Sequence, residues 1–124
     1  MAMIFKQELI AKEEEDFKRL KLAPEQRAIV EQMADVLNQY LSFSKLATMG
    51  FIWKAVRDWQ VRYSRSIAEL STSTPEDRIR SVREMTDGLA SYLIKVLKRT
   101  TDEEQVRKAC DSMYNFYVQN FSTR

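Results

Sequence analysis

Histidine is absent from this chain, and cysteine, glycine and proline are scarce. Its 124 residues include no His, one Cys, two Gly and two Pro. Without histidine the chain lacks the side chain best suited to proton transfer near neutral pH, and also the commonest transition-metal ligand. We therefore expect a protein that is not an enzyme, with no catalytic residues, no metal site and no cofactor.

The shortage of glycine and proline also restricts the fold. Tight turns between β-strands draw on these residues, whereas long helices joined by short connections need few of them. Gly50 and Gly88 stand far apart in the sequence and form no phosphate-binding loop, which excludes a P-loop nucleotide hydrolase. We expect an all-α fold in which residues 1–124 form a single helical domain.

The single cysteine and the lack of long apolar runs indicate where in the cell the protein is expected to be found. Cys110 has no partner for an intrachain disulfide, and it falls on the apolar face of its helix, where a thiol packs as a small hydrophobe. No apolar run approaches the roughly 20 residues of a membrane-spanning helix, and residues 1–8 do not resemble a signal peptide. We expect a cytoplasmic protein that does not bind membranes.

Apolar residues at steps of three or four predict an antiparallel bundle of four long helices, preceded by an irregular N-terminal helix. Pro24 fits the first turn of a helix, and Thr74 fits the cap of another. Residues 42–50 are expected to form a bend or a short helix, and Gly88 to mark a close approach between segments. Residues 1–22 are either a core helix or an arm. We expect the helices to begin near residues 3, 24, 52, 75 and 102.

The expected helix over residues 52–70 separates apolar from basic residues. Its apolar face carries Ile52, Val56, Trp59, Tyr63, Ile67 and Leu70. At about 100° per residue, the basic side chains lie on the opposite face. Residues 45–65 have a net charge of +4, with Trp53 at the edge of the apolar stripe. This pattern predicts a contact surface for an acidic protein or for phosphate, formed by Lys45, Trp53, Lys54, Arg57, Arg62 and Arg65.

Two observations leave alternatives open for this surface. Asp58 stands between Lys54 and Arg62 at helical spacing, so a solvated outer face with ordinary charge pairs is the competing interpretation. The acidic run at residues 13–16 offers the basic helix a partner, within one molecule or between two copies. Glu84 and Asp87 lie off the apolar stripe and are expected to form surface pairs with Arg80 or Arg83.

A second surface is predicted on the last helix. Tyr114, Val118 and Phe121 fall beside its apolar stripe, so this helix is apolar over more of its circumference than one core contact needs. Wider burial within the bundle is the alternative. We expect a small non-catalytic protein-interaction or assembly module whose partner is another protein or a second copy in a homo-oligomer. The alternative is a nucleic-acid-binding small subunit of a larger complex that uses the basic face of residues 45–65.

Overall fold

The computed structural model describes the backbone of residues 2–97 and 103–121, and their side chains except those of residues 2–7, 9, 71, 96, 97 and 121. In these ranges the chain forms six α-helices and no strand, so the predicted all-α helical bundle is confirmed. The helices are α1 (Ala2–Lys18), α2 (Pro24–Leu37), α3 (Lys45–Tyr63), α4 (Ile67–Ser71), α5 (Pro75–Leu97) and α6 (Glu103–Phe121).

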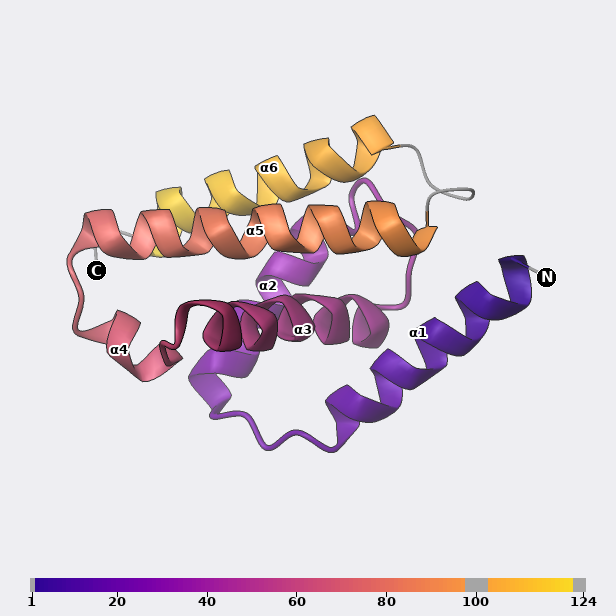
Figure 1. Ribbon diagram of the computed structural model, residues 1–124, viewed down its shortest axis with the longest axis horizontal. Coiled ribbons are helices and arrows are strands. Elements are labelled where there is room, and N and C mark those ends of the chain that lie inside the picture. The colour runs from indigo at the N-terminus through magenta and orange to yellow at the C-terminus, as the bar shows by residue number, and fades with distance from the viewer. Residues whose placement is uncertain (1, 98–102, 122–124) are drawn as a thin grey trace.

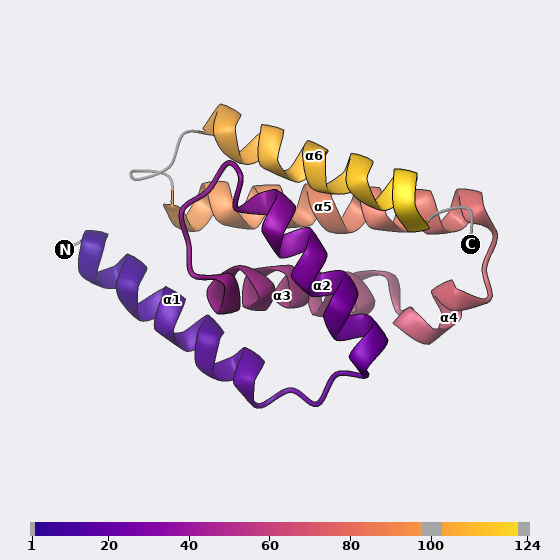
Figure 2. The same ribbon diagram turned by 180° about the vertical axis from the view of Figure 1, so that it is seen from behind.

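Helix α3 occupies the middle of the bundle. Helices α5 and α6 lie side by side and run in opposite directions, with α3 packed along α5 (Figure 1). Seen from behind, α2 crosses α3 obliquely and reaches α6, while α1 lies across the first half of α3 (Figure 2). Three helices, α1, α2 and α5, therefore pack on α3.

Local hydrogen bonds explain where the helices begin. Helix α2 begins at Pro24 as predicted, and the Thr74 hydroxyl caps α5 by accepting a 3.1 Å hydrogen bond from the Asp77 backbone N–H. Helix α3 begins at Lys45, earlier than its predicted start near residue 52. The reason is that Ser44 caps it, with the Ser44 Oγ accepting from the Ala47 N–H at 3.1 Å. Residues 45–50, expected to form a bend or a short helix, belong to α3, and the connection from α2 to α3 spans residues 38–44.

The prediction of one continuous helix over residues 52–70 is wrong. Ser64 has a left-handed backbone conformation, with φ of 51°, and this conformation ends α3 after Tyr63. Ser66 then starts α4, because its Oγ accepts a hydrogen bond of 3.3 Å from the Glu69 N–H. Ile67 and Leu70 therefore reach the interior from a separate short helix, and Tyr63 is left 42% exposed.

The buried apolar residues form two groups. The main cluster joins α1, α2, the first half of α3, α5 and α6, and includes Phe17, Leu37, Phe51, Leu93 and Met113. The smaller group, here called the α4 cluster, consists of Val56, Trp59, Leu70 and Met85, with Ile67 packed against it. The half-buried Trp53 packs against both clusters.

Helix α1 is held on α3 by a close backbone approach. Phe17 is 1% exposed within the main cluster, so the C-terminal half of α1 contributes to the core. A Cβ atom at Gly50 would lie only 2.7 Å from the backbone oxygen of Glu13, so glycine is needed where the two helices cross. The close approach predicted at Gly88 is wrong, since a Cβ there would meet no described atom within 4 Å.

This contrast between the two glycines generates a stability prediction. Gly50→Ala is expected to lower the free energy of unfolding by about 1–3 kcal/mol, because the added methyl group forces α1 away from α3. Gly88→Ala is the matched control and should raise the same free energy by about 0.5–1 kcal/mol through better helix propensity. Urea unfolding followed by circular dichroism measures both changes. A Gly50→Ala variant as stable as the wild type would contradict the crossing.

Candidate functional site

The cations predicted to form a contact surface have different surroundings in the structure. Lys45 Nζ lies 3.4 Å from Asp35 Oδ1, a contact that links α3 to α2. Lys54 Nζ lies 3.0 Å from Asp58 Oδ2, the helical pair that the spacing suggested. Exposed pairs of this kind contribute roughly 0–1 kcal/mol to stability, yet they neutralise charge that a partner would otherwise meet.

Arg65 is engaged in an ion pair that holds the segment after α3 against α5. Its Nη1 and Nη2 donate to the two carboxylate oxygens of Asp77 at 3.0 and 2.6 Å, and its guanidinium lies 5.7 Å from the centroid of the Trp59 ring. The hydrogen bond from Arg65 lowers the pKa of Asp77. This geometry gives Arg65 a structural role at the join between α3 and α4.

The acidic run of α1 meets the basic helix within one molecule. Glu13 is 4% exposed beside Gly50, and the Ser44 hydroxyl donates to Glu14 Oε2 at 3.3 Å. Burial raises the pKa of Glu13, although the charges of Lys54 and Arg57 favour its ionised form. Glu13 Oε2 has no hydrogen-bond partner among the described residues. The acidic run therefore lies against α3 within one molecule.

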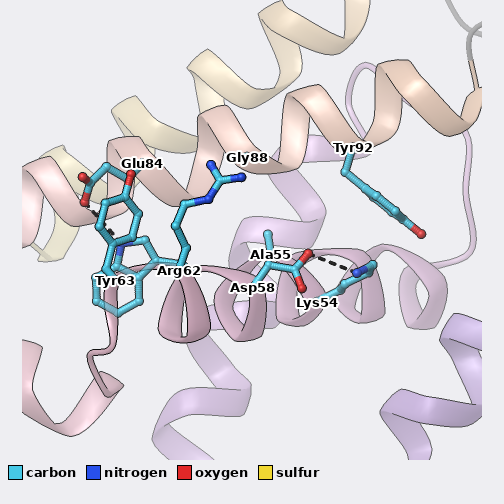
Figure 3. Close-up of a pocket in the computed structure, with 9 residues that line it drawn as sticks. Lys54, Ala55, Asp58, Arg62, Tyr63, Glu84, Gly88 and Tyr92 are labelled. Carbon is cyan, nitrogen blue, oxygen red and sulfur yellow. Dashed lines mark hydrogen bonds and ion pairs between the residues drawn. The ribbon is translucent and has the colours of Figure 1, made fainter.

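A shallow groove of about 80 Å³ lies between α3 and α5, and we take it as the candidate site (Figure 3). The Arg62 side chain extends from α3 toward Gly88 of α5, with Tyr92 at one end of the groove and Tyr63 at the other. Gly88 is exposed and has no side chain, so backbone is bare there. The groove is lined by Lys54, Ala55, Asp58, Trp59, Arg62, Tyr63, Glu84, Gly88 and Tyr92.

The polar groups at the two ends of the groove are fixed by contacts between the helices. Trp59 Nε1 donates to Glu84 Oε1 at 3.2 Å, so Glu84 contacts α3 and does not make the expected surface pair with Arg80 or Arg83. Asp87 makes its expected pair, with Arg83 at 3.3 Å. The Trp59–Glu84 hydrogen bond thus joins α3 to α5, whereas the Arg83–Asp87 pair lies within α5.

Tyr92 forms the other end of the groove. Lys54 Nζ lies 4.9 Å from the centroid of the Tyr92 ring. Burial raises the pKa of Tyr92 to about 12, and the negative charges of Glu13 and Asp58 act in the same direction. The phenol therefore stays protonated at neutral pH and remains a hydrogen-bond donor.

Beside the groove, the last turns of α3 combine exposed cations with exposed apolar residues. Arg57 and Arg62 are exposed and form no salt bridge with any residue that the structure describes. Val61 is 81% exposed and Tyr63 42%, which makes them the exposed large hydrophobic residues among the described side chains. Of the predicted cationic surface, Arg57 and Arg62 are thus the members left to meet a partner.

The remaining predicted site residues lie elsewhere. Trp53 packs against both core clusters. Tyr114 is half-buried, and the Arg83 guanidinium lies 4.9 Å from the centroid of the Tyr114 ring. Val118 is also half-buried. The side chain of Phe121 lies outside the described residues. The predicted second surface on α6 is therefore partly covered where the structure describes it.

Cys110 has the environment that the sequence predicted. It is 3% exposed in the main cluster, and burial raises the pKa of its thiol to about 12. The thiolate form that a nucleophile requires is therefore disfavoured at neutral pH.

Comparisons with protein-family models, curated proteins and solved structures found no match to this chain. Within the described ranges, none of the helices has the length and apolar character needed to cross a membrane.

The buried carboxyl group of Glu13 generates a pH prediction. Because its pKa is raised by folding, the folded state binds the proton more tightly, and stability falls as pH rises from the ordinary value near 4.5 through the raised one. Glu13→Gln should remove this fall and make the variant more stable than the wild type at neutral pH. Urea unfolding measured at a series of pH values from about 4 to about 8 detects the difference.

The control for this experiment is Glu15→Gln, which changes the same charge at an exposed position of the same run. It should leave the shape of the stability profile close to that of the wild type. Parallel profiles for the wild type and Glu13→Gln would show that Glu13 is not the titrating group.

Proposed function

We propose that this protein is a non-catalytic interaction module that binds an acidic segment of a protein partner in the groove between α3 and α5. The observation that carries the proposal is the position of Arg62, which extends toward the bare backbone at Gly88 without a salt bridge to any described residue (Figure 3). Arginine and tyrosine are enriched in protein interfaces, and here Tyr63 and Tyr92 lie at the two ends of the groove.

The chemistry of the groove favours a carboxylate-bearing partner. A guanidinium presents a planar fork of donors that matches a carboxylate, and Arg57 adds a second exposed cation on α3. The bare backbone at Gly88 allows a partner chain to approach closely, and Tyr63, which lines the groove and is 42% exposed, offers an apolar contact. Charge attraction would speed the encounter and set the orientation of the bound segment.

The same contacts make nucleic acid the weaker alternative. Affinity for nucleic acid depends on the number of phosphates that cations neutralise. Lys45, Lys54 and Arg65 already pair with carboxylates of this chain, which leaves Arg57 and Arg62, and of these two only Arg62 lines the groove. Two cations favour a short acidic peptide segment over an extended phosphate backbone.

Charge reversal tests the proposal. Affinity purification with cross-linking from the native host should recover a protein partner with the wild type and lose it with the Arg57→Glu, Arg62→Glu double variant. The matched control is Arg107→Glu with Lys108→Glu, which makes the same charge change on exposed residues of α6. Circular dichroism confirms that each variant is folded.

Other outcomes of this experiment would count against the proposal. Retention of the partner by the Arg57→Glu, Arg62→Glu variant would exclude this face as the binding site. The wild type could instead recover RNA or DNA whose binding weakens steeply as the salt concentration rises. If the double variant loses this nucleic acid, the nucleic-acid alternative is established. Recovery of a second copy of the chain would identify an assembly module that binds itself.

Gly88 provides a prediction that separates stability from binding. Gly88→Leu places a side chain in the groove, where there is open space for it, so the variant should fold with at least wild-type stability. It should bind the recovered partner at least about tenfold more weakly, a loss of about 1.4 kcal/mol, because the floor of the groove is filled. Isothermal titration calorimetry measures the affinity, and Asn115→Leu, an exposed position on α6, is the control.

A further inference from the structure

A partly open cavity of about 250 Å³ is lined by residues of both the main cluster and the α4 cluster. Its walls come from α2, α3, α4, α5 and α6, and almost all of them are apolar, including Met33, Ile52, Val82 and Leu89. Protein interiors are normally close-packed, and an engineered apolar cavity of about 150 Å³ in another protein is large enough to bind benzene. This cavity can therefore hold a ligand larger than a single aromatic ring.

One end of the cavity is polar. Gln26, Arg78 and Tyr117 are half-buried lining residues from the N-terminal turns of α2 and α5 and from the C-terminal part of α6. These parts of the three helices meet at the end of the bundle where α4 lies (Figures 1 and 2). An apolar cavity with a cation among its polar lining residues has the polarity of an amphiphile.

The position of Arg78 is held by its contacts. Its Nη1 donates to the Ser73 carbonyl oxygen at 2.5 Å, which ties the guanidinium to the loop before α5. Burial raises the pKa of Tyr117 while the Arg78 charge lowers it, so the phenol and the guanidinium are electrostatic neighbours. The phenol stays a hydrogen-bond donor at neutral pH, and both groups can donate to an anion.

We propose that the cavity binds a single-chain amphiphilic carboxylate of the medium-chain fatty-acid class. The alkyl chain occupies the space between the two clusters, and the carboxylate receives hydrogen bonds from Arg78 and Tyr117. Arginine is the side chain whose donors match a carboxylate best. The proposal is independent of the α3–α5 groove, because Arg57, Arg62 and Gly88 do not line the cavity.

The experiment compares two probes of equal chain length, decanoate and decanol, both below their aggregation concentrations. Trp53 lines the cavity, so tryptophan fluorescence reports its occupation, and calorimetry gives the affinity. The wild type should bind decanoate about tenfold more tightly than decanol, because only the carboxylate makes a charge-assisted hydrogen bond. Arg78→Gln should reduce this ratio to about one, whereas Arg80→Gln, an exposed arginine outside the cavity, should preserve it.

The ratio between the probes keeps the test valid even where Arg78→Gln weakens the fold, since both probes bind the same protein. Val82→Phe fills part of the cavity and should abolish binding of both probes. Where that variant does not fold, a series of carboxylates from hexanoate to tetradecanoate replaces it, and affinity should stop rising once the cavity is full.

Three results would overturn the proposal. The first is equal affinity of the wild type for decanoate and decanol, or no binding of either probe. The second is a preference for decanoate that survives Arg78→Gln. The third is affinity that increases with chain length throughout the series, which indicates adsorption to the protein surface and not occupation of a cavity.

Discussion

Burial of the first half of α3 on all sides is the constraint on which the rest of the bundle depends. Six consecutive residues, 47–52, are buried, because α1, α2 and α5 all pack on this part of the helix. A helix covered in this way must be apolar around its whole circumference and must have small residues where a neighbour crosses. Gly50 meets that need against α1, and Ala47 is fully buried.

Polar groups that are buried in this densely packed region need hydrogen-bond partners. Thr48 is fully buried, and its hydroxyl donates to Asn38 Oδ1 at 2.8 Å, which fixes the turn between α2 and α3. Glu13 lies in the same region because α1 crosses at Gly50, and its raised pKa is the consequence. The second half of α3 is packed less closely, so its cations and Val61 are available at the surface.

The parts of the fold that could be predicted from the sequence are helices with a single buried face. The stripes of α5 and α6 are regular, and Pro24 and Thr74 marked helix starts correctly. The start of α3 could not be found in this way, because its first half is buried on all sides and shows no stripe. The left-handed Ser64 and the caps Ser44 and Ser66 are also hard to anticipate, since many serines in this chain could take either role.

The candidate site was predictable only in part for a related reason. Periodicity placed Arg57 and Arg62 on the exposed face of a helix, and helical spacing indicated the contact between Lys54 and Asp58. The groove, however, requires a second helix. Which helices are neighbours decides whether Gly88 and Tyr92 of α5 line the groove and whether Arg65 pairs with Asp77. A single sequence contains no direct signal for the arrangement of its helices.

The break at Ser64 also accounts for the cavity. Because α3 ends there, α4 turns across the end of the bundle, where the bidentate contact of Arg65 with Asp77 holds the connecting segment to α5. Leu70 and its neighbours then form a cluster of their own instead of completing the main one. The pocket that results is partly open, so its apolar walls meet solvent. An occupant would cover that apolar surface, which stabilises a fold by roughly 25 cal/mol per Å² removed from water.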